Sequence, residues 1–388
     1  MSQPDTDKII SAIQSVIHPQ KEGAVALHEP CFNGNEWQYV KDCIDSTWVS
    51  YVGKYVDRFE EMLADYTGAR KAVAVVNGTA ALQIALKVAG VISGNEVIIP
   101  ALTFVATANA VIHCGAIPHF VDSEEKTLGL DPLKLKDYLK EIAIIDANGC
   151  KNKKTGNRIT AVIPMHTFGH PVELDALSAV CEEYKLIMIE DAAESLGSFY
   201  KGKHTGNWGK LSILSFNGNK TITTGGGGAI ITNDEDLGKL AKHLTTTAKI
   251  PHRWEFSHDH IGYNYRLPNI NAAIGCAQME QLPGFLEKKR ALSTRYQKAF
   301  QTIKGIRFYT EPSNSKSNYW LNVLLLDKAD IKQRDDILER TNDAGILTRP
   351  AWILLNKLHM FKNCPAADLS IAQDLEFRLI NIPSSVTL

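Results

Sequence analysis

Lys220 lies in a stretch whose composition suggests chemistry. It stands in "SFNGNKTITTGGGG" (215–228), between a short apolar run and four consecutive glycines. Glycines beside Lys-Thr suggest the phosphate-binding P-loop, which requires GxxxxGK[ST]. Leu214 occupies the first glycine position and Asn219 precedes the lysine, so the motif does not match. The near match "HTGNWGKL" (204–211) also fails, because it begins with histidine and ends with leucine.

Covalent chemistry explains Lys220 better, because other parts of the chain supply what a covalent cofactor needs. Lysine forms Schiff bases with carbonyl compounds, including pyridoxal 5′-phosphate (PLP). PLP also needs an acid near its pyridine nitrogen, donors for its phosphate and a flat partner for its ring. Asp191 follows Glu190 at the end of the buried apolar run "LIMIED", which makes Asp191 the candidate acid.

Candidate phosphate donors and a candidate ring partner are also present. "VVNGTAALQIAL" predicts a strand that passes through Gly78 and Thr79 into a helix, whose first amides can bind an anion. Ser215 can add a hydroxyl, and Phe104 in "PALTFVATANAVI" follows a strand, where its ring can stack on a cofactor. Each of these residues alone has an ordinary structural explanation, but their joint occurrence in one domain favours a PLP site.

The segments that must position these residues alternate between short apolar runs and helical stretches. The runs are "KAVAVV", "EVIIP", "IPHFVD", "AVIPMH", "LIMIED", "LSILSF" and "GAIITN". This pattern is typical of buried strands in a mostly parallel sheet with helices between them. It predicts the α/β fold class.

After residue 234 the pattern changes to a long helical periodicity, which we expect to be broken near Pro283-Gly284. Shorter strand-like and helix-like segments follow. We therefore expect a large α/β domain over 36–280 and a smaller α+β domain over 281–388. The N-terminal segment 1–35 is expected to pack with the small domain.

The composition limits the classes of partner. The chain has 388 residues with 42 Lys+Arg and 43 Asp+Glu, so no net field favours nucleic acid or an anionic membrane. No apolar run reaches the length of a membrane span, and the N-terminus lacks the features of a signal peptide. Seven scattered cysteines without a CxxC pair indicate reduced thiols. We expect a soluble cytoplasmic protein without nucleic-acid or membrane partners.

A histidine-rich segment, "HRWEFSHDHIGYNYR", invites a metal site. The spacing of His252, His258 and His260 matches no ligand pattern. We expect no metal, and we interpret the segment as a loop that bridges two subunits.

These motifs resemble those of the sugar aminotransferases of the DegT/DnrJ/EryC1/StrS family, which have the PLP-dependent transferase (aspartate aminotransferase, type I) fold with a mostly parallel seven-stranded sheet. The resemblance spans about residues 27 to 385. It is carried by "NGTAAL", "PALTFVATANAV", "IEDAAESLGS", "SFNGNKTITTGGGG" and "IGYNYRLPNINAAIGCAQ". It implies that Lys220 holds PLP covalently, that Asp191 pairs with the pyridine nitrogen and that Phe104 stacks on the ring. The implied phosphate ligands are Gly78, Thr79 and Ser215.

The resemblance also assigns residues outside the central group. Glu194 stands where relatives often have Gln or His near the phenolic oxygen of the cofactor, and a charged carboxylate there would repel the phenolate. Asn264 matches a residue that reaches the phosphate of the other subunit's cofactor, which implies a homodimer with shared sites. His166 and Arg349 lie in segments that relatives place near the sugar and the nucleotide phosphates. A hydrogen-bonded structural role explains His166 about as well, and a surface ion pair explains Arg349 nearly as well. Gly226 replaces the Glu of the GEGG found in many relatives, and we expect no loss of activity from this change.

The resemblance implies transfer of an amino group from L-glutamate, through pyridoxamine phosphate, to C4 of a nucleotide-linked 4-keto-6-deoxy hexose. Freed Lys220 would act as general acid and base. The all-glycine loop and "SNYWLNVLLL" are similar to the LegC-like subgroup of legionaminic acid and bacillosamine synthesis, which favours a UDP-linked 2-acetamido sugar, with GDP as the alternative. Two other classes stay open: a PLP-dependent sugar dehydratase, which would have histidine at position 220, and a non-catalytic sensor of sugar nucleotide or cofactor.

Overall fold

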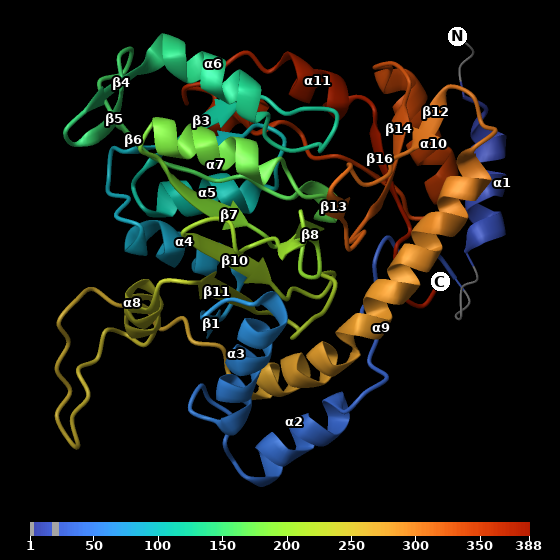
Figure 1. The fold of residues 1–388 in the computed structure, drawn as a ribbon. Helices are drawn as coiled ribbons and strands as arrows, with labels where there is room; N and C mark the ends of the chain where they lie inside the picture. The colour runs from blue at the N-terminus through green and yellow to red at the C-terminus, as the bar shows by residue number, and fades with distance from the viewer. Residues whose placement is uncertain (1–3, 18–22) are drawn as a thin grey trace.

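The computed structural model describes residues 4–17 and 23–388, so parts of the predicted N-terminal segment (1–3 and 18–22) lie outside the described residues. The seven predicted strands all form and make one sheet (Figure 1). In spatial order they are β1 (Lys71–Val75), β11 (Gly228–Thr232), β10 (Leu211–Ser215), β7 (Ile187–Asp191), β6 (Arg158–Val162), β2 (Glu96–Pro100) and β3 (Ile117–Val121).

The sheet is mainly parallel, as predicted. Every pair from β10 to β3 is parallel, and only β11 runs against its neighbours β1 and β10. A hairpin extends the sheet beside β6 and consists of β4 (Ala143–Asp146) and β5 (Gly149–Asn152). All strands of this sheet except β11 and β5 therefore run in the same direction, so their carboxyl ends lie at one edge of the sheet. Binding sites of α/β sheets form at this edge.

Helices cover both faces of this sheet because its strands are apolar on both sides. In β1, Val73 and Val75 face one core while Ala72 and Ala74 face another, as the two-residue period of a strand requires. The first face packs against α4 (Gly78–Val88), α5 (Val105–His113) and α8 (Glu235–Thr245). The second packs against α3 (Lys54–Thr67), α6 (Pro132–Ile142), α7 (Leu174–Glu183) and the start of α9 (Asn269–Phe300).

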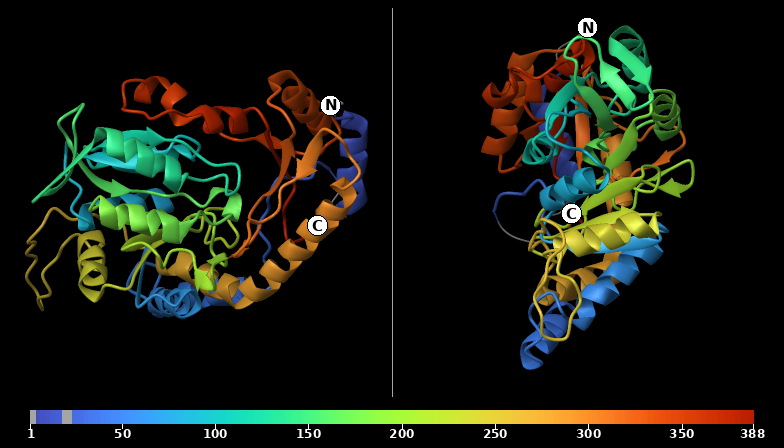
Figure 2. Two further views of the ribbon diagram at one scale, coloured as in Figure 1. Left: turned by 45° about the horizontal axis from the view of Figure 1, so that its top comes forward. Right: turned by 90° about the vertical axis from the view of Figure 1, so that its left-hand side faces the viewer.

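A smaller antiparallel sheet lies beside the large one (Figure 2). Its order is β12 (Ile306–Phe308), β14 (Asn322–Leu326), β16 (Leu379–Ile382) and β15 (Arg349–Pro350). Its core includes residues of α1 (Thr6–Val16), α10 (Ile331–Asp343) and the end of α9. Ile9 and Ile13 of α1 pack there with Tyr296 of α9 and Leu324 of β14.

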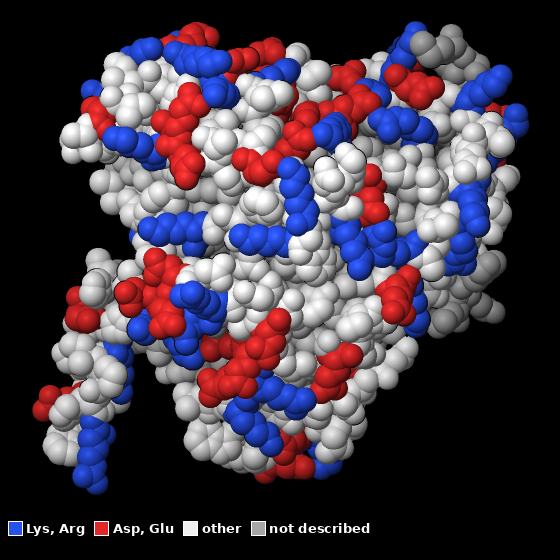
Figure 3. Space-filling model, in the orientation of Figure 1, with Lys and Arg blue, Asp and Glu red and all other residues white. Residues whose placement is uncertain are grey.

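The remaining elements are short and connect these layers. They are α2 (Glu36–Asp45), α11 (Ser370–Glu376), β8 (Phe199–Tyr200), β9 (Lys203–His204), β13 (Ser315–Lys316), and three 3-10 turns, η1 (Thr167–Gly169), η2 (Leu355–Lys357) and η3 (His359–Phe361). Within the described residues, no helix is both long and apolar enough to cross a membrane. On the face drawn in Figure 3, acidic and basic side chains alternate without a large area of one sign.

The expected break at Pro283 is wrong, because α9, a helix of 32 residues, continues through it. Proline removes one backbone donor and can kink or break a helix, but packing against two cores holds this helix together. Leu282 and Phe285 are buried in the core under the large sheet, whereas Leu292 and Tyr296 are buried under the small one. The two cores therefore share α9, and the proposed boundary at residue 280 lies inside it.

Gly228 is the point where β11 enters the sheet beside the N-terminus of α4. A Cβ added there would lie 2.5 Å from the carbonyl carbon of Asn77 and 2.7 Å from the amide nitrogen of Gly78. Backbone atoms cannot move aside as a flexible side chain can, so only glycine fits. Gly226, two residues earlier, has nothing within 4 Å of the same added atom.

We therefore expect Gly228→Ala to destabilise the protein by about 1–3 kcal/mol, the usual cost of overpacking a filled site. Gly226→Ala is the matched control and should change the free energy of unfolding by less than about 0.5 kcal/mol. Urea unfolding of the two variants and the wild type measures both values. Equal stability of the two variants would contradict the steric explanation.

Candidate active site

Lys220 lies in the loop between β10 and β11, at the carboxyl edge of the large sheet. Its side chain is only 12% exposed, and Nζ lies 3.2 Å from Glu194 Oε1. The same nitrogen lies 4.0 Å from the centroid of the Trp320 ring, in cation–π contact. An amine buried in this way is held in one place by a carboxylate on one side and an aromatic face on the other.

Asp191 ends β7, the strand beside β10, and is nearly buried. Thr107 Oγ1 of α5 donates a 2.7 Å hydrogen bond to Asp191 Oδ2, and the Ala193 amide donates to Oδ1 at 3.2 Å. These bonds fix the carboxylate at the strand end. Thr107 was not predicted as a site residue, although it lies in the quoted "PALTFVATANAV" motif.

Glu190 precedes Asp191, and strand alternation sends its side chain to the other face. Its oxygens accept hydrogen bonds from His166 Nε2 at 3.1 Å and from the amides of Gly206, Trp208 and Gly209 at 2.7–2.8 Å. Burial alone would raise the pKa of Glu190, but these hydrogen bonds outweigh it and hold the pKa below its usual value. Glu190 is thus a structural carboxylate.

A cavity of about 160 Å³ brings seven of the predicted residues together. They are Gly78, Thr79, Phe104, Asp191, Glu194, Ser215 and Lys220. They come from the ends of β1, β2, β7 and β10 and from the segments that follow, so the parallel arrangement of these strands is what assembles them.

One wall of the cavity is the N-terminus of α4. Asn77 caps this helix, with Oδ1 accepting from the Ala80 amide at 2.8 Å. Gly78 and Thr79 form the first turn, where unpaired amides and the helix dipole favour an anion. Ser215 lies against this turn, since a Cβ on Gly78 would be 3.0 Å from its Cβ. A phosphate group fits these donors.

Glu194 is buried and uses both of its oxygens. Oε1 contacts Lys220 Nζ, and Oε2 accepts a 2.9 Å hydrogen bond from the Phe168 amide. Burial raises the pKa of Glu194 to about 7, although the charge of Lys220 opposes this shift. A carboxyl with such a pKa is protonated in a large fraction of molecules at neutral pH.

Trp320 was not predicted as a site residue, because it lies 100 positions after Lys220 in a segment that leads into β14. Its indole Nε1 donates to the Asn219 carbonyl at 2.7 Å, which ties it to the lysine loop. Lys289 of α9 donates to the Trp320 carbonyl at 3.1 Å. Burial lowers the pKa of Lys289 to about 7. An aromatic residue before a strand was the only sequence signal for Trp320.

Phe104 lies at the N-cap position of α5 and is half exposed on the cavity wall, with its ring centroid 6.3 Å from that of Trp352. Three other predicted residues do not line this cavity. His166 is fully buried against Glu190, and its neighbour Met165 lines the cavity instead. Arg349 is exposed on β15 and donates to Asn342 Oδ1 at 2.9 Å. Asn264 is exposed beside the end of α8.

Known proteins resemble this chain over nearly its whole length. EpsN of Bacillus subtilis (strain 168) is 38% identical over 366 residues, covering 93% of this chain and 90% of EpsN. The GDP-perosamine synthase of Escherichia coli O157:H7 is 36% identical over 364 residues, covering 94% of each chain. Among solved structures, the aminotransferase TlmJ from Streptoalloteichus hindustanus has a TM-score of 0.85 at 26% identity, covering 94% of this chain and 95% of TlmJ.

Helicobacter pylori PseC, an aminotransferase involved in the biosynthesis of pseudoaminic acid, has a TM-score of 0.83 at 25% identity and covers 93% of each chain. The pattern of the DegT/DnrJ/EryC1/StrS aminotransferase family matches residues 30–388. This match includes the large sheet, the lysine loop and the small sheet with Trp320. We conclude that the chain belongs to the DegT/DnrJ/EryC1/StrS family of PLP-dependent sugar aminotransferases.

Proposed function

We propose that this enzyme transfers an amino group from L-glutamate to C4 of a nucleotide-linked 4-keto-6-deoxy hexose, giving a 4-amino-4,6-dideoxy sugar nucleotide. The acceptor that we favour is UDP-2-acetamido-2,6-dideoxy-hexos-4-ulose, for bacillosamine- or legionaminic acid-type surface glycans. A relative from Campylobacter jejuni, 33% identical over 295 residues, is named for a UDP-4-amino-4,6-dideoxy-N-acetyl-altrosamine. The GDP-perosamine synthases support a GDP-linked sugar as the alternative.

The observation that carries this proposal is that Lys220 Nζ, the Asp191 carboxylate and the anion-binding start of α4 open into one cavity. This donor set fits PLP: an amine for its aldehyde, a carboxylate for its ring nitrogen, and amides and hydroxyls for its phosphate. Bound PLP supplies an electron sink for the carbanion that forms when an amino acid loses its α-proton. The Phe104 ring on the cavity wall is available to stack.

The residues of the chain then have distinct roles. Asp191, fixed by Thr107, would hold a proton on the ring nitrogen. Lys220 Nζ, when released from its covalent bond, would carry the proton between donor and acceptor carbons. Trp320 and Glu194 keep this nitrogen within the cavity and restrict its access to water.

Glu194 need not repel the phenolic oxygen of the cofactor. Because burial keeps its pKa near 7, a protonated Glu194 can donate a hydrogen bond to that oxygen. The carboxyl would thus replace the Gln or His of relatives as a donor. We propose this as its role.

We also propose a homodimer. The segment 249–263, here called the arm, projects from the end of α8 (Figures 1 and 2). It exposes large apolar side chains, with Trp254 69%, Phe256 78% and Ile261 89% exposed. The body carries a hollow of about 590 Å³ lined in part by Trp48 and Tyr51. A second copy that covers these surfaces would explain their exposure, and Asn264 at the base of the arm would then reach the partner's site.

The dehydratase and the sensor remain the alternative functions. A dehydratase of this family would have histidine at position 220, and a sensor would have no need of both Lys220 and Asp191. Both residues line the cavity. A nucleotide-sugar substrate and seven free thiols fit a cytoplasmic enzyme.

Absorbance of the purified protein tests the reaction class. Wild-type protein should show the near-visible band of lysine-bound PLP, lose it with L-glutamate, and regain it with the UDP-linked 4-keto sugar more readily than with a GDP-linked one.

Lys220→Ala should lower turnover by about 10³-fold or more, because it removes the proton carrier. Lys210→Ala, at an exposed lysine before β10, is the control. A protein that stays colourless with added PLP would discard the aminotransferase mechanism.

The titration of Glu194 predicts a stability change in the protein freed of PLP. Its pKa rises from 4.5 in the unfolded chain to about 7 in the folded one, so the folded state binds the proton more tightly. Stability is therefore lost as pH rises from 4.5 to 7, by up to about 3 kcal/mol. Glu194→Gln should remove this loss, and Glu61→Gln, on the exposed face of α3, should retain it. Chemical unfolding at several pH values measures the slopes, and identical slopes for wild type and Glu194→Gln would show that Glu194 stays ionised.

Sedimentation velocity tests the dimer. The double variant Trp254→Ser/Phe256→Ser should raise the dimer dissociation constant about tenfold or more, as loss of aromatic anchors does. Leu133→Ser removes an equally exposed apolar side chain from α6, away from the arm, and should leave the constant unchanged. A wild-type protein that sediments as a monomer at all concentrations would rule out the shared site.

A further inference from the structure

The root of the arm, the region around the paired residues Lys249 and His258, lies beside the C-terminal end of α8. The two sides of the arm pair at Lys249 and His258, and the Tyr263 amide donates to the Leu244 carbonyl at 2.7 Å. The backbone that leaves the arm therefore returns beside the last turn of the helix. The orientation of the arm depends on this small region.

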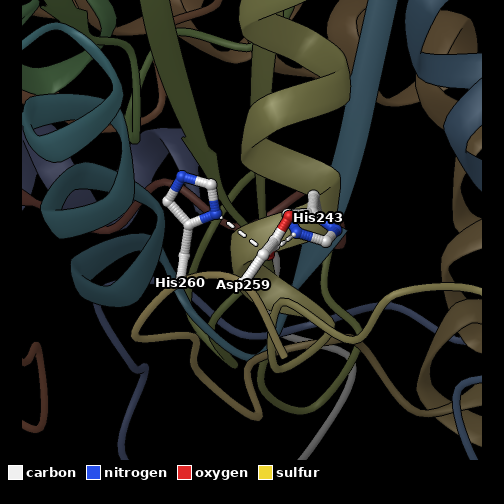
Figure 4. A group of neighbouring side chains, drawn as sticks. All are labelled: His243, Asp259 and His260. Carbon is white, nitrogen blue, oxygen red and sulfur yellow. Dashed lines mark hydrogen bonds and ion pairs between the residues drawn. The ribbon is translucent and has the colours of Figure 1, made fainter. Parts of the chain in front are cut away.

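Three side chains converge at this root (Figure 4). His243 is in the last turn of α8, and Asp259 and His260 are in the returning side of the arm. Asp259 Oδ1 lies 2.6 Å from His243 Nε2 and 2.9 Å from His260 Nδ1. The two imidazole rings are nearly perpendicular, at 88°, with centroids 5.9 Å apart. Both rings thus direct a nitrogen at one point from different directions, rather than stacking.

The chemistry of these groups is that of a transition-metal site. Two imidazole nitrogens and a carboxylate are common zinc ligands, with bonds of about 2.0–2.2 Å, which places ligand atoms of a tetrahedral ion roughly 3.4 Å apart. The three ligand atoms here all lie within 4.8 Å of one another. Side-chain rotations that move these ligand atoms by less than about 1 Å would make room for an ion between them. Magnesium and calcium prefer all-oxygen sites, so a nitrogen-rich set selects zinc or its neighbours.

The charge and exposure of the group also suit a cation. Asp259 contributes a carboxylate, whose oxygens are common ligands of a divalent ion. All three side chains are partly exposed, which leaves the fourth coordination position to water. None of them lines the cavity around Lys220.

We propose that His243, Asp259 and His260 bind one divalent transition-metal ion, with zinc as the best fit, and that the ion fastens the root of the arm to α8. The site is structural and separate from the aminotransferase cavity, so it does not depend on the proposed substrate. It would also fix the backbone four residues before Asn264.

Zinc binding to untagged holoenzyme, stripped of metal by dialysis, tests this site by competition with a chromophoric chelator. The wild type should bind one zinc ion per chain. His243→Ala and His260→Ala should each weaken binding by about tenfold or more, since loss of a ligand costs at least as much as loss of its supporting partner. His258→Ala is the matched control in the same arm, because its Nδ1 lies 2.9 Å from the Thr247 carbonyl and not in the cluster.

Cobalt(II) substitution identifies the type of ligand, and trypsin digestion shows whether zinc protects the arm from cleavage. Cobalt should give a spectrum without the intense near-ultraviolet band of thiolate ligation, and zinc should slow cleavage after Arg253 in the wild type but not in His260→Ala. The proposal is overturned by wild-type protein that binds no more zinc than His260→Ala, by loss of binding in His258→Ala, by a thiolate band, or by cleavage that zinc leaves unchanged.

Discussion

The burial of the Lys220 amine is the constraint on which much of this structure depends. An amine that is only 12% exposed loses most of its hydration, and this loss is costly unless other groups compensate for it. Glu194 and the Trp320 ring provide that compensation. Glu194 lies in the segment after β7 of the large sheet, and Trp320 lies in the segment before β14 of the small sheet. Lys220 Nζ therefore has both contacts only when the large and small sheets are docked.

The docking itself is fixed by α9 and the buried Lys289. The helix contributes to the cores of both sheets, so neither half can move far without disturbing the other. Lys289 Nζ donates to the carbonyls of Trp320 and Ser384, at 3.1 and 2.7 Å. It thus joins α9 to the segment before β14 and to the segment after β16. A buried amine that satisfies carbonyls is specific in direction, since the hydrogen bonds fail if either segment shifts. The position of the Trp320 ring next to Lys220 is thus set by the hydrogen bond from Lys289 of α9.

The neighbouring carboxylates of β7 show how the geometry of a strand separates a side chain that supports the fold from one that faces the cavity. Glu190 and Asp191 are adjacent in the chain and point to opposite faces. Glu190 collects amide donors and His166 within the protein, while Asp191 opens into the cavity. Beyond the end of β6, Met165 is bridged to Asp191 and lines the cavity, whereas the next residue, His166, contacts Glu190.

The sequence by itself determined the seven strands, the α/β class and the group around Lys220, because strand ends in a parallel sheet meet at one edge and the motifs at those ends are local. It could not determine that α9 passes through Pro283, because packing on two cores outweighs the missing hydrogen bond. The partners of the lysine and the direction of His166 were likewise decided by tertiary structure. Trp320 reaches Lys220, and His243 reaches Asp259, through contacts between segments that no spacing in the sequence relates. Local pattern specifies which residues an element presents, but only the docking of elements decides which of them meet.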